Sequence, residues 1–284
     1  MLVRTLGVTG SASGPRSPAS TYLFQVKAAD VAAGIAAGTV PKGIPVRDWS
    51  VIVDIGQGGF GLLERHVRAH DIDAVAISHF HADHFSDICS FYVHLKYHPV
   101  FGYAWSGIGP YIPVWGPSEI ESHLSDSCCS IDSSNGDMAF LPNGWVDQVP
   151  VNIGPITIIP YKVWHSVESF GMRIIGPSAA RGGETVTISY SGDTDYCDAV
   201  VDLARNADLF LCEASYIVGR DDKAPAGIHL TGKGAGRVAR EAAAKKLVLV
   251  HIPSWNNPAT SLAEAKEEYH GPIEVAKCNG VFEL

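Results

Sequence analysis

Three histidines and an aspartate fall within six consecutive positions, in the segment HFHADH at residues 79–84. The segment follows directly after a short apolar run. Imidazole and carboxylate groups without a cysteine pair are ligands that Zn, Mn and Fe accept. Alternation along the chain predicts that His79 and His81 point one way and that Asp83 and His84 point the other. This pattern indicates two metal sites that share a bridging carboxylate.

Further candidate ligands stand at the ends of later strand-like runs. His165, Asp193 and His251 each end such a run, as His79 does. Side chains at the same ends of neighbouring strands converge in space, so these residues are expected to meet. For each of these three residues taken singly, a capping or core role is the alternative to metal binding. Two metals held there would acidify a water molecule and stabilise both oxygens of a hydrolytic displacement.

The elements that must position these residues follow from the hydrophobic pattern. Strand-like runs rich in Val and Ile occur at residues 2–8, 21–26, 51–56, 73–79, 156–165, 185–193, 207–213 and 245–251. Helix-like segments occur at 59–70, 234–246 and 258–269. The pattern predicts two sheets sandwiched between helices, in one domain over residues 1–284. Residues 27–48 resemble an Ala-rich helical insertion with a following loop, and residues 97–145 a long irregular excursion that partly lines a pocket.

Charge and composition narrow the class of ligand. The chain of 284 residues carries a formal net charge of −9, with acidic and basic residues mixed along it. This balance argues against a general nucleic-acid binder, but not against a small anion, because bound metals reverse the local field. No apolar stretch is long enough for a membrane span, and no signal-peptide core is present, so a cytoplasmic protein is expected. The cysteines are expected to be reduced thiols: Cys89, Cys128, Cys129, Cys197, Cys212 and Cys278.

The motif H-x-H-x-D-H, with "VIVDIGQG" before it and "SYSGDT" and "LVLVHIP" after it, resembles the metallo-β-lactamase superfamily. The resemblance implies an α+β fold, the αββα sandwich, with two mixed sheets packed face to face and helices outside. It also implies two divalent metal ions, most simply Zn, with Mn and Fe as alternatives. The implied ligands are His79, His81 and His165 at one site and Asp83, His84 and His251 at the other, with Asp193 bridging.

Two further residues point to a branch of this superfamily. Glu213 in "LFLCEASY" and His229 in "GIHLTG" are similar to the Glu-Ala-Thr and His-Ser-Thr motifs of the phosphodiesterase branch, which includes tRNA 3′-processing endonucleases. Glu213 would orient and charge His229, and the imidazolium would stabilise a phosphorane oxygen or protonate a leaving alkoxide. A purely structural Glu–His pair is the alternative.

The segment between His165 and Asp193 bears on the substrate. The tRNA endonucleases that this chain resembles carry a long basic arm there, whereas here residues 166–192 are enough only for a hairpin. An acidic chain without the arm is poorly equipped to hold tRNA. "GSASGPRSPASTYL", "VESFGMRI" and "HLTGKGAGRVA" resemble a group of actinobacterial proteins with an atypical cyclic-nucleotide phosphodiesterase activity.

The sequence therefore predicts a dinuclear metal-dependent phosphodiesterase with Asp83, His229 and Glu213 as catalytic residues. A hydroxide between the metals would attack phosphorus in a small cyclic nucleotide such as cAMP. One alternative is an RNase Z-like RNA 3′-processing endonuclease in which a partner protomer replaces the arm, and another is a thioester or lactone hydrolase on the same metals. A non-enzymatic metal-containing module is the third. A small phosphodiester is the expected partner, with tRNA less expected, no membrane, and a homodimer suggested by the resemblance.

For several residues near these motifs, one interpretation is that they support the metal ligands or the substrate pocket. Asp54 is expected to cap the Gly turn after its strand and to support the ligand loop. Trp255 would stack on a base or cap the metal pocket, with a packing role as the alternative. Ser166 and Ser191 flank ligands and would donate hydrogen bonds to them, unless they are plain surface hydroxyls. No catalytic role is assigned to His66, His70, His94, His98, His123 and His270.

Overall fold

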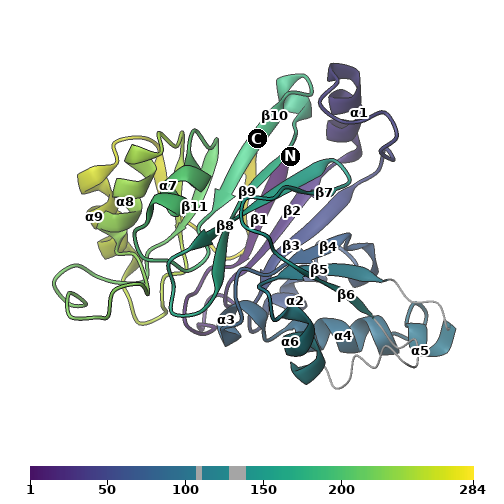
Figure 1. Cartoon of the computed structure of the whole chain (residues 1–284), viewed down its shortest axis with the longest axis horizontal. Helices are drawn as coiled ribbons and strands as arrows, with labels where there is room; N and C mark the ends of the chain where they lie inside the picture. Colours follow the sequence, from purple (N-terminus) through teal and green to yellow (C-terminus); the bar gives the residue numbers. More distant parts are fainter. Residues whose placement is uncertain (107–110, 128–138) are drawn as a thin grey trace.

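The computed structural model describes residues 1–106, 111–127 and 139–284, and these residues form two seven-stranded sheets (Figure 1). The first sheet has the order β14-β1-β2-β3-β4-β5-β6. It is antiparallel from β14 to β3 and parallel from β3 to β6. Its strands are β1 (Leu2–Gly7), β2 (Thr21–Val26), β3 (Trp49–Ile55), β4 (Ala74–Ala76), β5 (Ile112–Gly116), β6 (Phe140–Gly144) and β14 (Gly280–Glu283).

The second sheet has the order β13-β12-β11-β10-β9-β8-β7. It is antiparallel from β7 to β10 and parallel from β10 to β13. Consequently β8, β10, β11 and β12 all run in one direction and end at the same edge. Its strands are β7 (Val151–Ile153), β8 (Ile156–Val163), β9 (Ser169–Pro177), β10 (Thr185–Tyr190), β11 (Leu209–Glu213), β12 (Leu247–Val250) and β13 (Ile273–Val275).

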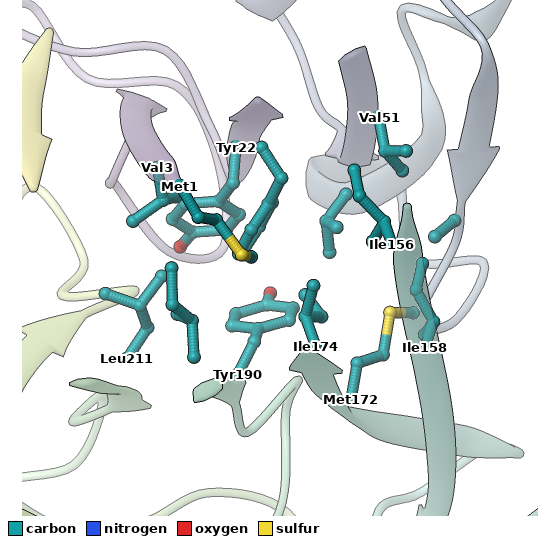
Figure 2. Packing of buried hydrophobic residues seen from close by; sticks show 14 of the residues in the cluster. Met1, Val3, Tyr22, Val51, Ile156, Ile158, Met172, Ile174, Tyr190 and Leu211 are labelled. Atoms are coloured by element: carbon teal, nitrogen blue, oxygen red, sulfur yellow. The ribbon is translucent and has the colours of Figure 1, made fainter. Parts of the chain in front are cut away.

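The main hydrophobic core lies between the two sheets. Figure 2 shows side chains of the two sheets pointing toward one another across this space. The rings of Tyr22 on β2 and Tyr190 on β10 have centroids 4.8 Å apart, and both residues are fully buried. Burial of each large apolar side chain contributes about 1.5–3 kcal/mol, so this layer is a major source of stability.

Helices cover the outer face of each sheet, which completes the predicted αββα sandwich (Figure 1). The first sheet packs against α2 (Gly59–Leu63), α4 (Ile88–Tyr97) and α6 (Ile120–Ser127), and the second against α7 (Asp198–Ala204), α8 (Gly232–Glu241) and α9 (Pro258–Glu268). Because both faces of β11 and β12 are covered, the runs LFLC in β11 and LVLV in β12 are apolar without alternation. In the described part of the chain, no helix is both long and apolar enough to cross a membrane.

Some predicted elements differ from the observed ones. The helix expected over 59–70 is the short α2, followed by a turn and the 3-10 helix η1 (Ala69–Asp71). Arg68 adopts an extended conformation, which turns the chain so that Ala69 is buried beneath the sheet. The insertion at 27–48 contains the expected helix, α1 (Ala28–Ala37), which ends at Gly38 in the left-handed conformation. A second 3-10 helix is η3 (Ala179–Arg181).

The prediction of an irregular excursion over residues 97–145 is wrong for much of the segment. The segment contains α5 (Tyr103–Ser106) and α6, and it supplies two parallel strands, β5 and β6. Pro113 and Pro142 hide these strands in the sequence, because proline lacks the amide that a sheet uses. Strand β6 forms the edge of its sheet, where proline is tolerated. Residues 107–110 and 128–138 of this segment lie outside the described residues.

The described cysteines are free thiols, as predicted: Cys89, Cys197, Cys212 and Cys278. Cys128 and Cys129 lie outside the described residues.

Candidate metal centre

The seven predicted ligands meet at the carboxyl ends of strands from both sheets. The amide of Phe170, on β9 of the second sheet, donates a 3.0 Å hydrogen bond to the carbonyl of Ser78, just after β4 of the first. Asp83 and His84 lie on the short helix α3 (Ala82–Phe85), and His81 immediately precedes it. The other four ligands follow strand ends: His79 after β4, His165 after β8, Asp193 after β10 and His251 after β12.

One group of donor atoms comprises His79, His81, His165 and Asp193. His81 Nδ1 lies 3.0 Å from His79 Nε2 and 3.2 Å from His165 Nε2. Asp193 Oδ2 lies 3.8 Å from His79 Nε2. Four donor atoms within 4.8 Å of one another can surround a single cation.

A second group comprises Asp83, His84, Asp193 and His251, all of them buried. His251 Nε2 lies 2.9 Å from Asp83 Oδ2 and 3.1 Å from His84 Nε2. Asp193 Oδ1 is 3.3 Å from His84 Nε2, and its Oδ2 is 3.3 Å from His251 Nε2. Asp193 therefore belongs to both groups, in the position that a bridging ligand would occupy.

The ring nitrogens that face away from these groups are held by the protein. His165 Nδ1 donates to the Ile228 carbonyl at 2.7 Å, and His84 Nδ1 donates to Asp54 Oδ2 at 2.8 Å. His251 Nδ1 lies 2.8 Å from Ser215 Oγ. A neutral imidazole that donates from one nitrogen keeps a lone pair on the other. When these rings are neutral, as metal binding requires, their lone pairs point inward, an arrangement typical of metal-ligating histidines.

Burial and charge in the first group favour neutral ligands. Burial is the main cause that lowers the pKa of His79, His81 and His165. Imidazoles must be deprotonated to bind a metal, so these shifts favour metal binding over proton binding.

The second group concentrates negative charge on buried carboxylates. Burial alone would raise the pKa of Asp83 and Asp193, but His251 and His84 outweigh it and lower both. Burial likewise opposes a charge on His84, yet the carboxylates of Asp193 and Asp54 raise its pKa. Asp193 Oδ1 is buried and accepts no hydrogen bond from any residue that the structure describes. A cation would satisfy this oxygen, so the residues present fit a divalent metal.

Asp54 supports the ligand loop as predicted, but through its side chain rather than by capping the Gly turn. Its φ of 53° directs the carboxylate inward, where Oδ1 accepts a 2.7 Å hydrogen bond from the Ser78 amide. Oδ2 accepts from Ser78 Oγ at 2.7 Å and from the Tyr190 hydroxyl at 2.8 Å. The supporting roles of Ser78 and Tyr190 escaped the sequence analysis, although Ser78 directly precedes a predicted ligand.

Glu213 and His229 lie beside the second group. His229 Nδ1 is 3.1 Å from Glu213 Oε1 and 3.8 Å from Asp193 Oδ2. Burial opposes a charge on His229, but the Glu213 carboxylate outweighs it and raises the pKa of His229 to about 9. The structure therefore brings together a buried carboxylate and an imidazole whose pKa that carboxylate raises.

Hydroxyl groups position Glu213. The Ser215 hydroxyl, which the sequence analysis missed, donates to Glu213 Oε2 at 2.8 Å. The Ser191 hydroxyl accepts a 3.0 Å hydrogen bond from the Glu213 amide, so Ser191 supports this residue rather than a metal ligand. Ser166 is exposed, and no hydrogen bond from it to another described residue is seen.

A pocket of about 450 Å³ opens next to His81. The rings of Phe80 and His123 stack in its wall at 3.8 Å between centroids. Glu168 lies opposite in the lining and accepts hydrogen bonds from the Ser118 amide and hydroxyl at 2.8 Å each. The expectation that residues 97–145 partly line a pocket is therefore confirmed. Trp255 is 66% exposed, which argues against a packing role.

The chain matches proteins that have been described before. A family model for the beta-lactamase superfamily domain matches residues 51–252. An uncharacterized protein of Mycobacterium tuberculosis is 37% identical over 284 residues, covering 99% of this chain and 92% of that protein. The probable metallo-hydrolase YhfI of Bacillus subtilis is 31% identical over 238 residues, covering 83% of this chain and 88% of that protein.

Structural comparison agrees with these matches. The crystal structure of YhfI, a metallo-beta-lactamase fold protein, superposes with a TM-score of 0.76 at 26% identity and covers 99% of each chain. A ribonuclease Z of Myxococcus xanthus is 28% identical over 283 residues, covering 80% of this chain and 85% of that protein.

Proposed function

The chain belongs to the beta-lactamase superfamily and is a metal-dependent hydrolase, and on this basis we propose that it hydrolyses a small phosphodiester. The observation that carries the proposal is the Glu213–His229 pair beside two groups of candidate ligands. Hydrolysis of a phosphodiester places negative charge on phosphoryl oxygens and on the leaving oxygen. A protonated imidazole held next to a metal centre is suited to both.

The proposed ligand sets follow the two groups of donor atoms. When bound, two divalent ions would acidify a water molecule and stabilise negative charge on the phosphoryl group. Imidazole and carboxylate ligands suit Zn, with Mn or Fe as alternatives. The sets are His79, His81 and His165 for one ion and Asp83, His84 and His251 for the other, with Asp193 bridging.

His229 is proposed to donate a proton at the leaving oxygen. Its Nδ1 donates to Glu213, which leaves Nε2 without a partner among the described residues and available to substrate. Glu213 fixes the ring orientation and keeps the imidazole protonated near neutral pH. Asp83, which is also a proposed ligand and lies 2.9 Å from His251 Nε2, completes the proposed catalytic set.

The pocket next to His81 and the short segment between His165 and Asp193 support a small cyclic nucleotide such as cAMP. The pocket next to His81 offers the stacked rings of Phe80 and His123, against which a nucleobase can pack. The chain between His165 and Asp193 forms the hairpin of β9 and β10, with the short 3-10 helix η3 in its connection. Because the protein carries a formal net charge of −9, it lacks the excess of positive charge that binds a polynucleotide backbone.

Hydrolysis of cAMP by purified protein reconstituted with Zn or Mn tests the proposal. We expect turnover in the wild type and its loss in Asp83→Ala, because that variant lacks a proposed ligand. His229→Ala should bind both metals while kcat falls by about 10²–10⁴-fold, as for a lost general acid. Loss of metal from His229→Ala would contradict its role as a proton donor.

Similarity to a ribonuclease Z supports RNA 3′ processing as the second candidate. A precursor tRNA is therefore assayed with the same metal-loaded protein. Specific cleavage of the tRNA, without turnover of cAMP, would show that RNA and not a cyclic nucleotide is the substrate. Absence of both activities in protein with two metals bound would overturn the phosphodiesterase proposal.

A further inference from the structure

A second pocket, of about 420 Å³, is lined in part by the residues that follow His251 in the chain. None of the seven candidate ligands lines it. Its walls come from the loop after β1, the segment 252–258 after β12 and the chain that follows β13. Leu249, Ile252 and Val275 form an apolar surface within it. The pocket is therefore separate from the centre described above.

The charged groups of this pocket all have one sign. Arg16 and Lys277 line it, and the lining contains no Asp or Glu. Both cations are exposed, and neither forms an ion pair within the part of the chain that the structure describes. In a protein with a net charge of −9, two cations in one pocket lining without an acidic residue favour an anion locally.

The polar wall of the pocket is held in place by the protein. Asn256 Nδ2 donates to the Ser215 carbonyl at 2.7 Å, and Asn256 Oδ1 accepts from Arg220 at 2.6 Å. Ser215 in turn contacts His251 through its hydroxyl at 2.8 Å. A ligand in the pocket would thus contact the segment that positions His251. A wall whose hydrogen bonds are already made loses little entropy when a ligand binds.

We propose that this pocket is a second binding site, for a small anionic group carried on an apolar body. Arg16 and Lys277 would bind the anionic group, and Ile252 and Val275 would contact the apolar body. A phosphoryl group or a carboxylate satisfies the same two cations. The site does not depend on the phosphodiesterase proposal, because none of its residues belongs to the metal centre.

Fluorescence titration with anilinonaphthalene sulfonate tests the site, since this probe joins a sulfonate to apolar rings. The charge reversal Arg16→Glu with Lys277→Glu should weaken its binding by about tenfold or more, because two charge-assisted contacts are lost. The matched control reverses two other exposed cations without a described ion pair, Lys42→Glu with Arg65→Glu, and changes the net charge equally. The control should bind the probe as the wild type does.

Competition identifies the head group. Displacement of the probe by phenylphosphonate indicates a phosphoryl ligand, and displacement by octanoate indicates a carboxylate; either supports the proposal. Failure of both competitors would overturn the class of ligand. Equal affinity in the wild type and both variants, or an equal loss in both variants, would show that these two cations form no specific site.

Discussion

The carboxylate of Asp54 lies 2.8 Å from Nδ1 of His84, and both side chains are fully buried. Asp54 is the penultimate residue of strand β3, whereas His84 lies on α3 after the ligand loop. The same carboxylate accepts from Tyr190 on the second sheet. One buried anion therefore joins the two sheets and orients a candidate metal ligand.

Asp54→Asn should weaken metal binding at the group that contains His84. We expect an affinity lower by about 10–100-fold, because the acceptor that fixes the imidazole is weakened. Tyr190→Phe is the matched control, since it removes one hydrogen bond to the same carboxylate without changing its charge. That variant should lose only about 1–3 kcal/mol of unfolding free energy. Chelator competition measures the Zn affinity, and urea denaturation of the metal-free protein measures the unfolding free energy. A Zn affinity in Asp54→Asn equal to that of the wild type would refute the orienting role.

Ser215→Ala should also reduce metal affinity, by about 10–100-fold, because it removes the hydroxyl that contacts His251 Nδ1 and Glu213. Ser166→Ala makes the same substitution beside His165, at an exposed hydroxyl, and should leave affinity unchanged. Chelator competition distinguishes the two variants. Indistinguishable affinities would mean that the Ser215 hydroxyl does not support the centre.

Glu213→Gln should change the pH dependence of turnover. His229 acts in its protonated form, so kcat is expected to fall as pH rises through its pKa, about 9. The Glu213 carboxylate raises that pKa, so its removal should move the alkaline limb to lower pH. The kcat–pH profile of the metal-loaded protein measures the shift. In His229→Ala the limb should be absent, and an unmoved limb in Glu213→Gln would contradict the proposed pairing.

Gly56→Ala should destabilise the protein at the ligand loop. A Cβ at Gly56 would lie 1.9 Å from the carbonyl oxygen of Asp83, so the backbone that carries two ligands would have to move. We expect a loss of about 1–3 kcal/mol or more in unfolding free energy, together with weaker metal binding. Gly43→Ala serves as the control, because a Cβ there meets nothing within 4 Å. Urea denaturation that gives equal stabilities for the two variants would show that the close approach carries no cost.

The sequence alone was sufficient to predict the sandwich and to select the residues that the structure brings together. The strand pattern is local, since buried strands in a doubly covered sheet are continuously apolar, and each candidate ligand stands next to such a run. Glu213 and His229 were selected by their resemblance to a motif. Strands β5 and β6 were not found, because Pro113 and Pro142 weaken the local signal while pairing with neighbouring strands overrides it.

The structure brings the candidate ligands together in two groups, but not for the reason that the sequence analysis gave. His79 and His81 lie in a loop, and Asp83 and His84 diverge from them because the helix α3 begins after His81. Strand alternation, which the prediction invoked, plays no part there. The direction of each ligand thus depends on where the helix starts.

Only the tertiary structure decided which atoms meet. His84 and His251 are 167 positions apart, yet their Nε2 atoms lie 3.1 Å from one another. Asp54 and Tyr190 are likewise joined only because the two sheets pack face to face. Local sequence determines which faces are apolar and where strands end, and these properties depend on near neighbours. The second pocket around Arg16 and Lys277 arises from segments distant in the chain, so its charge and shape exist only in the folded protein.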